Sequence, residues 1–239
     1  MMRSQPKLVM LPGMDGTGEL FGPFLECLPN VQAQVIPLPQ TGPQDYDSLA
    51  SHVREQLPDD EFYLLAESFS GPIGAILAAD ATPGLRGVIF VATFLSIPSP
   101  LAVCIGRRLP LHRMMRLPFS SWTQRRLLLG SDVGDDFLQR FNAAVRTVPP
   151  NTLKARLKSL QQLHWRHEPA PIPSIYLQAS DDYLVSPGKV QEIQQYFPNN
   201  RLMRIKGPHF LLQANPAACA RTLLDTFAIW ESRQRAALP

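Results

Sequence analysis

The sequence has few cysteines and no long apolar run. Its 239 residues include Cys27, Cys104 and Cys219, which are odd in number and widely scattered. This excludes a disulfide framework, and the spacing fits no metal site. No apolar stretch approaches the roughly 20 residues of a membrane-spanning helix. Residues 1–6 run directly into an apolar segment, which leaves no room for a secretory leader. We therefore expect no metal, no stable membrane insertion and a reducing, cytoplasmic setting.

The signatures of nucleotide and nucleic-acid binding are also missing. The glycine-rich segment 11–18 has the spacing Gly-x-x-Gly-x-Gly rather than the dinucleotide pattern Gly-x-Gly-x-x-Gly, and no lysine stands where a P-loop needs one. We expect no cofactor. The arginines between residues 98 and 170 lie among leucines and prolines with few aromatic neighbours, so nucleic-acid binding is not expected.

What the sequence does contain is an alternation of short apolar runs with amphipathic stretches, which is typical of parallel βαβ units. The expected strands are 8–11, 34–38, 62–67, 88–92, 174–178 and 201–205. The expected helices are 20–28, 46–56, 69–79, 189–196 and 216–233. The pattern predicts an α/β fold with a mostly parallel sheet.

The alternation stops between residues 98 and 170, where the pattern is helical and rich in Leu, Arg and Pro. We predict a helical cap over 98–170, inserted into a core of 1–97 and 171–239. The cap has twelve Lys/Arg and four acids, a net charge of +8; since the whole chain has +3, the remainder has −5. The basic residues that could meet an acidic partner are Arg107, Arg108, Arg113, Arg116, Arg125, Arg126, Lys154 and Lys158.

Ser68 occupies a strand-to-helix turn. An apolar run over 62–67 ends on it, and a helix of small residues follows at once. A nucleophile elbow needs small residues two places either side of its serine, and Ala66 and Ser70 fill those places. The alternative is an ordinary turn between a strand and a helix.

A serine nucleophile needs a base, and five histidines compete for that role. His209 follows the last expected strand and lies at the loop edge of the sheet, so it is favoured. His52 falls within an amphipathic helix, and His112, His164 and His167 belong to the cap. The alternative for His209 is a turn residue that caps the next helix.

Asp181 and Asp182 follow the strand 174–178 and are candidates to orient the base. Asp182 is favoured because Asp182-Tyr183-Leu184-Val185-Ser186-Pro187 fits the acid-x-apolar-Val-x-Pro turn that often follows such an aspartate. The alternative is an Asp-rich turn without a catalytic role.

Two backbone N–H groups should bind the developing oxyanion, from Phe69 after the serine and from Met14 in the loop after the first strand. Glycines at 13, 16 and 18 allow this loop to approach a reacting carbonyl closely. The alternative is a glycine-rich turn that binds an anion at the start of a helix.

These segments together resemble the α/β-hydrolases over nearly the whole chain: Leu11-Pro12-Gly13, Ala66-Glu67-Ser68-Phe69-Ser70-Gly71, Asp182-Tyr183-Leu184-Val185 and Gly207-Pro208-His209-Phe210. The order Ser68, Asp182, His209 is the order of the triad in that family. The resemblance implies a Ser-His-Asp mechanism with an acyl-enzyme, a helical cap that shapes the acyl pocket, and a shortened sheet of about six strands. The sequence departs from the family at Pro12, where many members have His, and at the two elbow glycines.

Within that family, the compact size and basic cap resemble the pimeloyl-carrier-protein methyl ester esterases. That resemblance implies a carboxylesterase whose cap docks an acidic acyl carrier protein. The loop 12–18 is also similar to that of plant phytyl ester synthase-like acyltransferases. We therefore predict a serine ester hydrolase acting on a small-molecule acyl ester. A thioesterase or acyltransferase with the same triad is the first alternative, and a non-catalytic binding module is the second.

Overall fold

The structure is a computed structural model and describes residues 7–98 and 134–236. Within these ranges six strands form a single sheet in the order β2-β1-β3-β4-β5-β6, and every neighbouring pair is parallel. The strands are β1 (Lys7–Leu11), β2 (Ala33–Val35), β3 (Phe62–Glu67), β4 (Leu85–Val91), β5 (Ser174–Ala179) and β6 (Asn200–Ile205). Because all strands run the same way, their carboxyl ends meet at one edge of the sheet.

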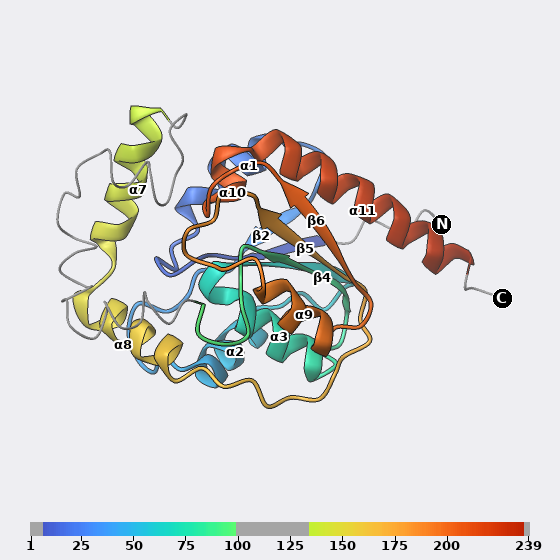
Figure 1. Cartoon of the computed structure of the whole chain (residues 1–239), viewed down its shortest axis with the longest axis horizontal. Coiled ribbons are helices and arrows are strands. Elements are labelled where there is room, and N and C mark those ends of the chain that lie inside the picture. The colour runs from blue at the N-terminus through green and yellow to red at the C-terminus, as the bar shows by residue number, and fades with distance from the viewer. Residues whose placement is uncertain (1–6, 99–133, 237–239) are drawn as a thin grey trace.

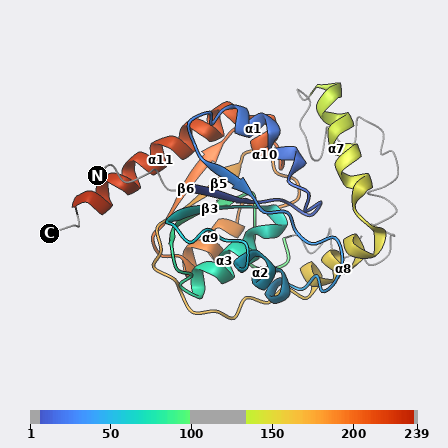
Figure 2. The ribbon, with the colours of Figure 1, turned by 180° about the vertical axis from the view of Figure 1, so that it is seen from behind.

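Helices cover both faces of the sheet (Figures 1 and 2). One face packs against α1 (Gly22–Glu26), α10 (Leu211–Ala214) and α11 (Pro216–Ala236), and the other against α2 (Tyr46–Arg54), α3 (Gly71–Ala79) and α9 (Lys189–Tyr196). Two short 3₁₀ turns, η1 (Glu19–Phe21) and η2 (Ser68–Ser70), precede α1 and α3. Successive residues of β3 and β4 point to opposite faces, and both sets are buried, which explains the continuous apolar runs.

The predicted α/β fold with about six parallel strands is confirmed, and most expected strands match within three residues at each end. The main difference is β2, which ends at Val35 although the apolar run continues to Leu38. Pro37 and Pro39 lack the N–H that a longer ladder would need.

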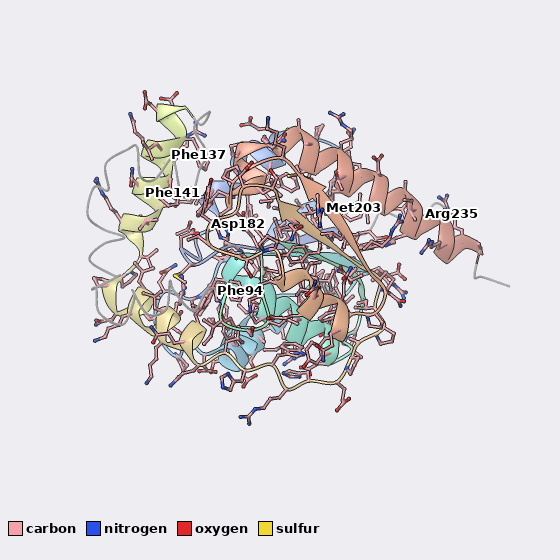
Figure 3. The ribbon with its side chains drawn as sticks, viewed as in Figure 1. Phe94, Phe137, Phe141, Asp182, Met203 and Arg235 are labelled. Carbon is pink, nitrogen blue, oxygen red and sulfur yellow. The ribbon has the colours of Figure 1, made fainter. Side chains whose placement is uncertain are left out.

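Two helices from the expected cap, α7 (Asp135–Thr147) and α8 (Pro150–Gln161), lie beside the core at the carboxyl edge of the sheet (Figures 1 and 2). Phe137 and Phe141 lie on the side of α7 that faces the core (Figure 3), and the Phe141 ring packs edge-on against Phe210 at 5.1 Å. The division into core and cap stays a prediction, because residues 99–133 of the expected cap lie outside the described residues. Six arginines of the proposed basic surface belong to that segment: Arg107, Arg108, Arg113, Arg116, Arg125 and Arg126.

One basic residue of the expected cap is not on a surface at all. Arg156, on α8, is completely buried, whereas Lys154 and Lys158 on the same helix are exposed. The net charge of +8 therefore overstates the positive charge that this segment presents to solvent.

Within residues 7–98 and 134–236, no helix combines the length and the apolar character needed to cross a bilayer.

Candidate active site

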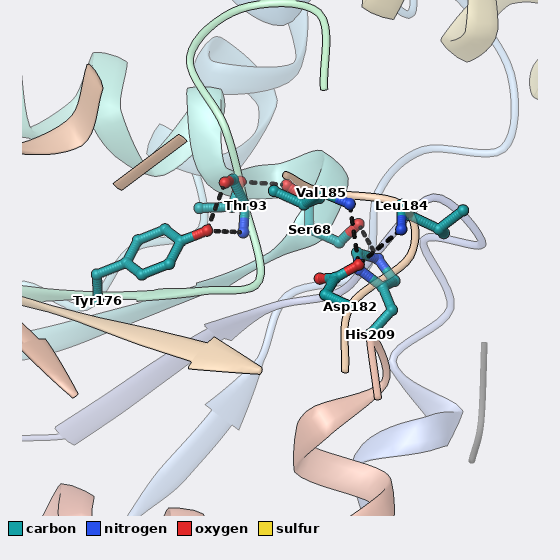
Figure 4. A network of polar contacts seen from close by, with 7 residues as sticks. All are labelled: Ser68, Thr93, Tyr176, Asp182, Leu184, Val185 and His209. Carbon is teal, nitrogen blue, oxygen red and sulfur yellow. Dashed lines mark hydrogen bonds and ion pairs between the residues drawn. The ribbon is translucent and has the colours of Figure 1, made fainter. Parts of the chain in front are cut away.

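Ser68 stands where β3 turns into η2, and its backbone has a φ of +50°. This left-handed conformation is unusual for a residue other than glycine and stores strain at the turn. The Ser68 carbonyl accepts a hydrogen bond of 2.5 Å from Thr93 Oγ1. Thr93 is held in turn by Tyr176, whose hydroxyl donates to the Thr93 carbonyl at 2.8 Å (Figure 4). The turn is thus fixed from the neighbouring strands.

The small residues expected around the serine are present, and one of them has a further contact. Ala66 lies against α3, where a methyl group added to Gly74 would approach the Ala66 Cβ to 2.8 Å. Ser70 is fully buried and donates a hydrogen bond of 2.5 Å to the carbonyl of Pro12. From the sequence, Ser70 was expected only to be a small residue of the elbow. A hydroxyl at position 70, where the elbow pattern usually has glycine, could have indicated this hydrogen bond, because glycine has no side chain to donate it.

His209 lies beside Ser68 although 141 residues separate them. Its Nε2 is 2.9 Å from Ser68 Oγ, and its Nδ1 is 2.8 Å from Asp182 Oδ2 (Figure 4). The side chains of His209 and Asp182 are 5% and 6% exposed. With the ring proton on Nδ1 donated to the carboxylate, Nε2 is free to accept the Ser68 hydroxyl proton.

Asp182 is oriented by the turn that follows it. Its Oδ1 accepts hydrogen bonds from the backbone N–H groups of Leu184 at 2.8 Å and Val185 at 2.9 Å, which leaves Oδ2 directed at His209. Asp181 is exposed and accepts instead from the Ser180 hydroxyl at 2.7 Å. The structure therefore brings Asp182, and not Asp181, to the histidine.

The other histidines lie elsewhere in the described residues, apart from His112, which is outside them. His52, on α2, contacts Gln56 at 2.8 Å, His164 is exposed next to Leu163, and His167 packs on Trp165.

The loop between β1 and η1 lies over the serine. A methyl group added at Gly13 would be 3.9 Å from Ser68 Cβ. Met14, the next residue, is half-buried, and within the described part of the chain its N–H has no hydrogen-bond acceptor. Phe69 follows the serine within η2, and its ring is buried against Tyr46, with the ring centroids 5.0 Å apart. These are the positions from which two N–H groups could reach an oxyanion beside Ser68.

Glu67, directly before the serine, was not singled out from the sequence. It is 4% exposed, and the only hydrogen bond to its carboxyl group within the described residues is a weak one of 3.3 Å from Gln213 Nε2 to Oε2. Burial raises the pKa of the Glu67 carboxyl to about 7, and the nearby Asp15 adds to this increase. Glu67 therefore changes charge near neutral pH inside the core.

Replacing Glu67 by glutamine should change how stability depends on pH. The pKa of Glu67 rises from 4.5 to about 7 on folding, so the folded state binds more protons between these values and the free energy of unfolding falls as pH increases through them. The shift corresponds to about 3 kcal/mol. In urea unfolding at pH 5 and pH 8, wild type should lose up to about that much more stability than Glu67→Gln. Equal losses in the two proteins would contradict the assignment.

The sequence model of the alpha/beta hydrolase fold family matches residues 43–216, which are most of the chain. The chain belongs to the alpha/beta hydrolase fold family. This assigns the chain to a family of hydrolase enzymes, as the sequence predicted. Comparison with curated protein sequences found no significant match.

Solved structures with this fold include enzymes of several activities. An esterase from Exiguobacterium antarcticum aligns with a TM-score of 0.78 at 14% identity, over 94% of this chain and 92% of that chain. An enol-lactonase from Burkholderia xenovorans LB400 gives 0.76 at 15% identity, over 95% and 92%. A bromoperoxidase from Bacillus anthracis also gives 0.76 at 15% identity, over 94% and 92%. At identities this low, the structural similarity establishes only that the chain shares the alpha/beta hydrolase fold.

Proposed function

We propose that this alpha/beta hydrolase is a serine carboxylesterase that cleaves small to medium acyl esters through an acyl-enzyme on Ser68. One observation supports the proposal most strongly: an unbroken line of contacts runs from Ser68 Oγ through the His209 ring to Asp182. All three residues follow strands that end at the same edge of the sheet.

In the first half of the reaction, His209 Nε2 takes the proton of the Ser68 hydroxyl while Oγ forms a bond to the acyl carbon. Asp182 stabilises the resulting imidazolium through Nδ1. The negative oxygen of the tetrahedral intermediate accepts hydrogen bonds from the N–H groups of Met14 and Phe69. When the bond from the acyl carbon to the alcohol oxygen breaks, His209 returns its proton to that oxygen and the alcohol leaves.

In the second half, a water molecule takes the place of the alcohol. His209 removes one of its protons as the water oxygen bonds to the acyl carbon, and the proton passes to Ser68 Oγ as the acyl bond breaks. The products are a carboxylic acid and the free serine, so the cycle needs no further reactant.

An apolar environment beside the triad favours an aliphatic acyl group. Phe94 and Val185 belong to a buried cluster against which Met14 and Leu184 also pack. Leu184 and Val185 directly follow Asp182, and Met14 belongs to the loop over Ser68. Burial of each additional methylene against these apolar side chains would contribute up to about 0.8 kcal/mol, so the length of the acyl chain should affect the rate strongly.

For the substrate itself, the finer proposal is a methyl ester attached to an acidic acyl carrier protein, docked on a cap formed by residues 98–170. Lys154 and Lys158 are exposed one turn apart on α8, at the carboxyl edge of the sheet, and support such a surface. Attraction of this kind should weaken as salt is added.

The proposal is tested with p-nitrophenyl esters of increasing chain length, a thioester, an added alcohol acceptor, and a half-ester with and without its carrier protein. We expect hydrolysis to the free acid, and complete inactivation when one fluorophosphonate attaches to Ser68. Dominant transfer to the alcohol would replace hydrolysis by acyl transfer. A folded protein that neither hydrolyses an ester nor accepts the fluorophosphonate would contradict the proposed function.

A further inference from the structure

Arg156 is a charged side chain enclosed entirely by protein. Its Nη1 donates to the carbonyls of Met14 at 2.7 Å and Asp15 at 2.9 Å, its Nη2 to the Pro39 carbonyl at 3.0 Å, and its Nε to Gln44 Oε1 at 2.9 Å. Burial lowers the pKa of the guanidinium to about 10, opposed by the nearby Asp15. Arg156 therefore stays charged at neutral pH, and four charge-assisted hydrogen bonds offset its loss of water.

A side chain that only anchored α8 would not need these particular partners. The same helix already contacts the segment 39–44 through other side chains: Thr152 Oγ1 donates to the Gln40 carbonyl at 2.6 Å, and Ser159 Oγ to the Gln44 carbonyl at 2.8 Å. Arg156 extends beyond this segment to the loop that lies over Ser68. Its hydrogen bonds join α8 to the loop from which the oxyanion donor would come.

The backbone of that loop is held at every carbonyl from residue 12 to residue 16. The donors are Ser70 Oγ to Pro12, Gly16 N–H to Gly13, Arg156 Nη1 to Met14 and Asp15, Gln40 Nε2 to Asp15, and Leu38 N–H to Gly16. In a trans peptide the N–H points opposite to the preceding carbonyl. The Met14 N–H therefore points away from the bond between Gly13 and Gly16, and the Arg156 bond fixes the next peptide plane.

We propose that Arg156 is a positioning residue for the oxyanion site: by holding the carbonyls of Met14 and Asp15, it keeps the peptide that follows Met14 turned away from the oxyanion, so that the Met14 N–H beside Ser68 stays unobstructed. Without it, the peptide between Met14 and Asp15 could rotate and turn a carbonyl toward the negative oxygen, which would repel it. This inference rests on the proposed function, and it adds a residue from α8 to the reaction without direct contact with substrate.

Gly16 makes room for this arrangement. Its backbone φ is +69°, and a methyl group there would lie 2.5 Å from Arg156 Nη1. Gly18 has a similar φ of +79°, but its added methyl would meet Val35 rather than the guanidinium. The two glycines therefore form a matched pair that differs in the contact with Arg156.

The test compares Arg156→Lys with Thr152→Val, which removes a neighbouring buried contact of α8 but no hydrogen bond made to the loop itself. For a p-nitrophenyl ester, Arg156→Lys should lower kcat about 10- to 100-fold with KM changed less than about threefold. Inhibition by a boronic acid, which becomes tetrahedral on the serine, should weaken by a similar factor. Thr152→Val should keep kcat within about threefold of wild type. Thermal unfolding of each variant separates these effects from general destabilisation.

If Arg156→Lys does not fold, Gly16→Ala and Gly18→Ala provide the same comparison, and kcat should fall clearly further in Gly16→Ala. The positioning role is overturned if Arg156→Lys keeps the kcat of wild type, or if the variant and its control lose kcat equally. In either case an active wild type leaves the proposed function standing. A wild type with no esterase activity and no reaction at Ser68 overturns the proposed function and this inference with it.

Discussion

Changing Ser68 to alanine should reduce kcat for ester hydrolysis by about 10⁵- to 10⁶-fold, because the variant has no oxygen to form the acyl-enzyme. His209 and the loop over the site would remain in place, so KM should change little. The alanine methyl group fills the space of Ser68 Cβ, and the strained φ of +50° is the same for both residues. Stopped assays with a p-nitrophenyl ester, together with circular dichroism of the folded variant, provide the measurement.

A sensitive control for this variant is covalent labelling of the serine by a fluorophosphonate. Ser68→Ala should also fail to take up a fluorophosphonate that labels wild type completely. If the variant kept more than about one hundredth of the wild-type kcat, another group would be the nucleophile and the site assignment would be wrong.

Changing Asp182 to asparagine should reduce kcat by about 10⁴-fold. The amide oxygen of the new side chain can still accept from the N–H groups of Leu184 and Val185, so its NH₂ group would take the place of Oδ2. That group donates, which forces His209 Nδ1 to become an acceptor and moves the ring proton to Nε2. A protonated Nε2 cannot take the proton of Ser68, so the geometry survives while the base is lost.

Asp181→Asn is the matched control for this change. Asp181 precedes Asp182 directly but is exposed and contacts Ser180 rather than the histidine. The kcat of Asp181→Asn should stay within about threefold of the wild-type value. A large loss in Asp181→Asn together with a small one in Asp182→Asn would reverse the assignment of the acid.

The sequence predicted the positions of Ser68, Asp182 and His209 because each follows an apolar strand, and the carboxyl ends of parallel strands share one edge. It could separate Asp182 from Asp181 only by the turn that follows. The structure adds the reason: Leu184 and Val185 N–H groups hold one oxygen of Asp182 and leave the other for His209.

Arg156 could not be recognised in the same way. In the sequence it lies between Lys154 and Lys158 and resembles one more charge on an exposed helix. Its burial depends on acceptors from segments more than one hundred residues away, chiefly the carbonyls of Met14, Asp15 and Pro39. No local pattern encodes those carbonyls, because any residue supplies one. The pKa of Glu67 escaped prediction for a similar reason, since it depends on burial by distant elements.

The central claim is that Ser68 becomes acylated during turnover, and the most direct measurement is rapid acid quenching of wild type with p-nitrophenyl acetate, followed by mass spectrometry of the peptide that contains Ser68. We predict a transient acetyl group on Ser68 that forms no more slowly than turnover and disappears as substrate is consumed. Turnover without acetyl-Ser68, under conditions where nitrophenol release shows a burst, would contradict the account.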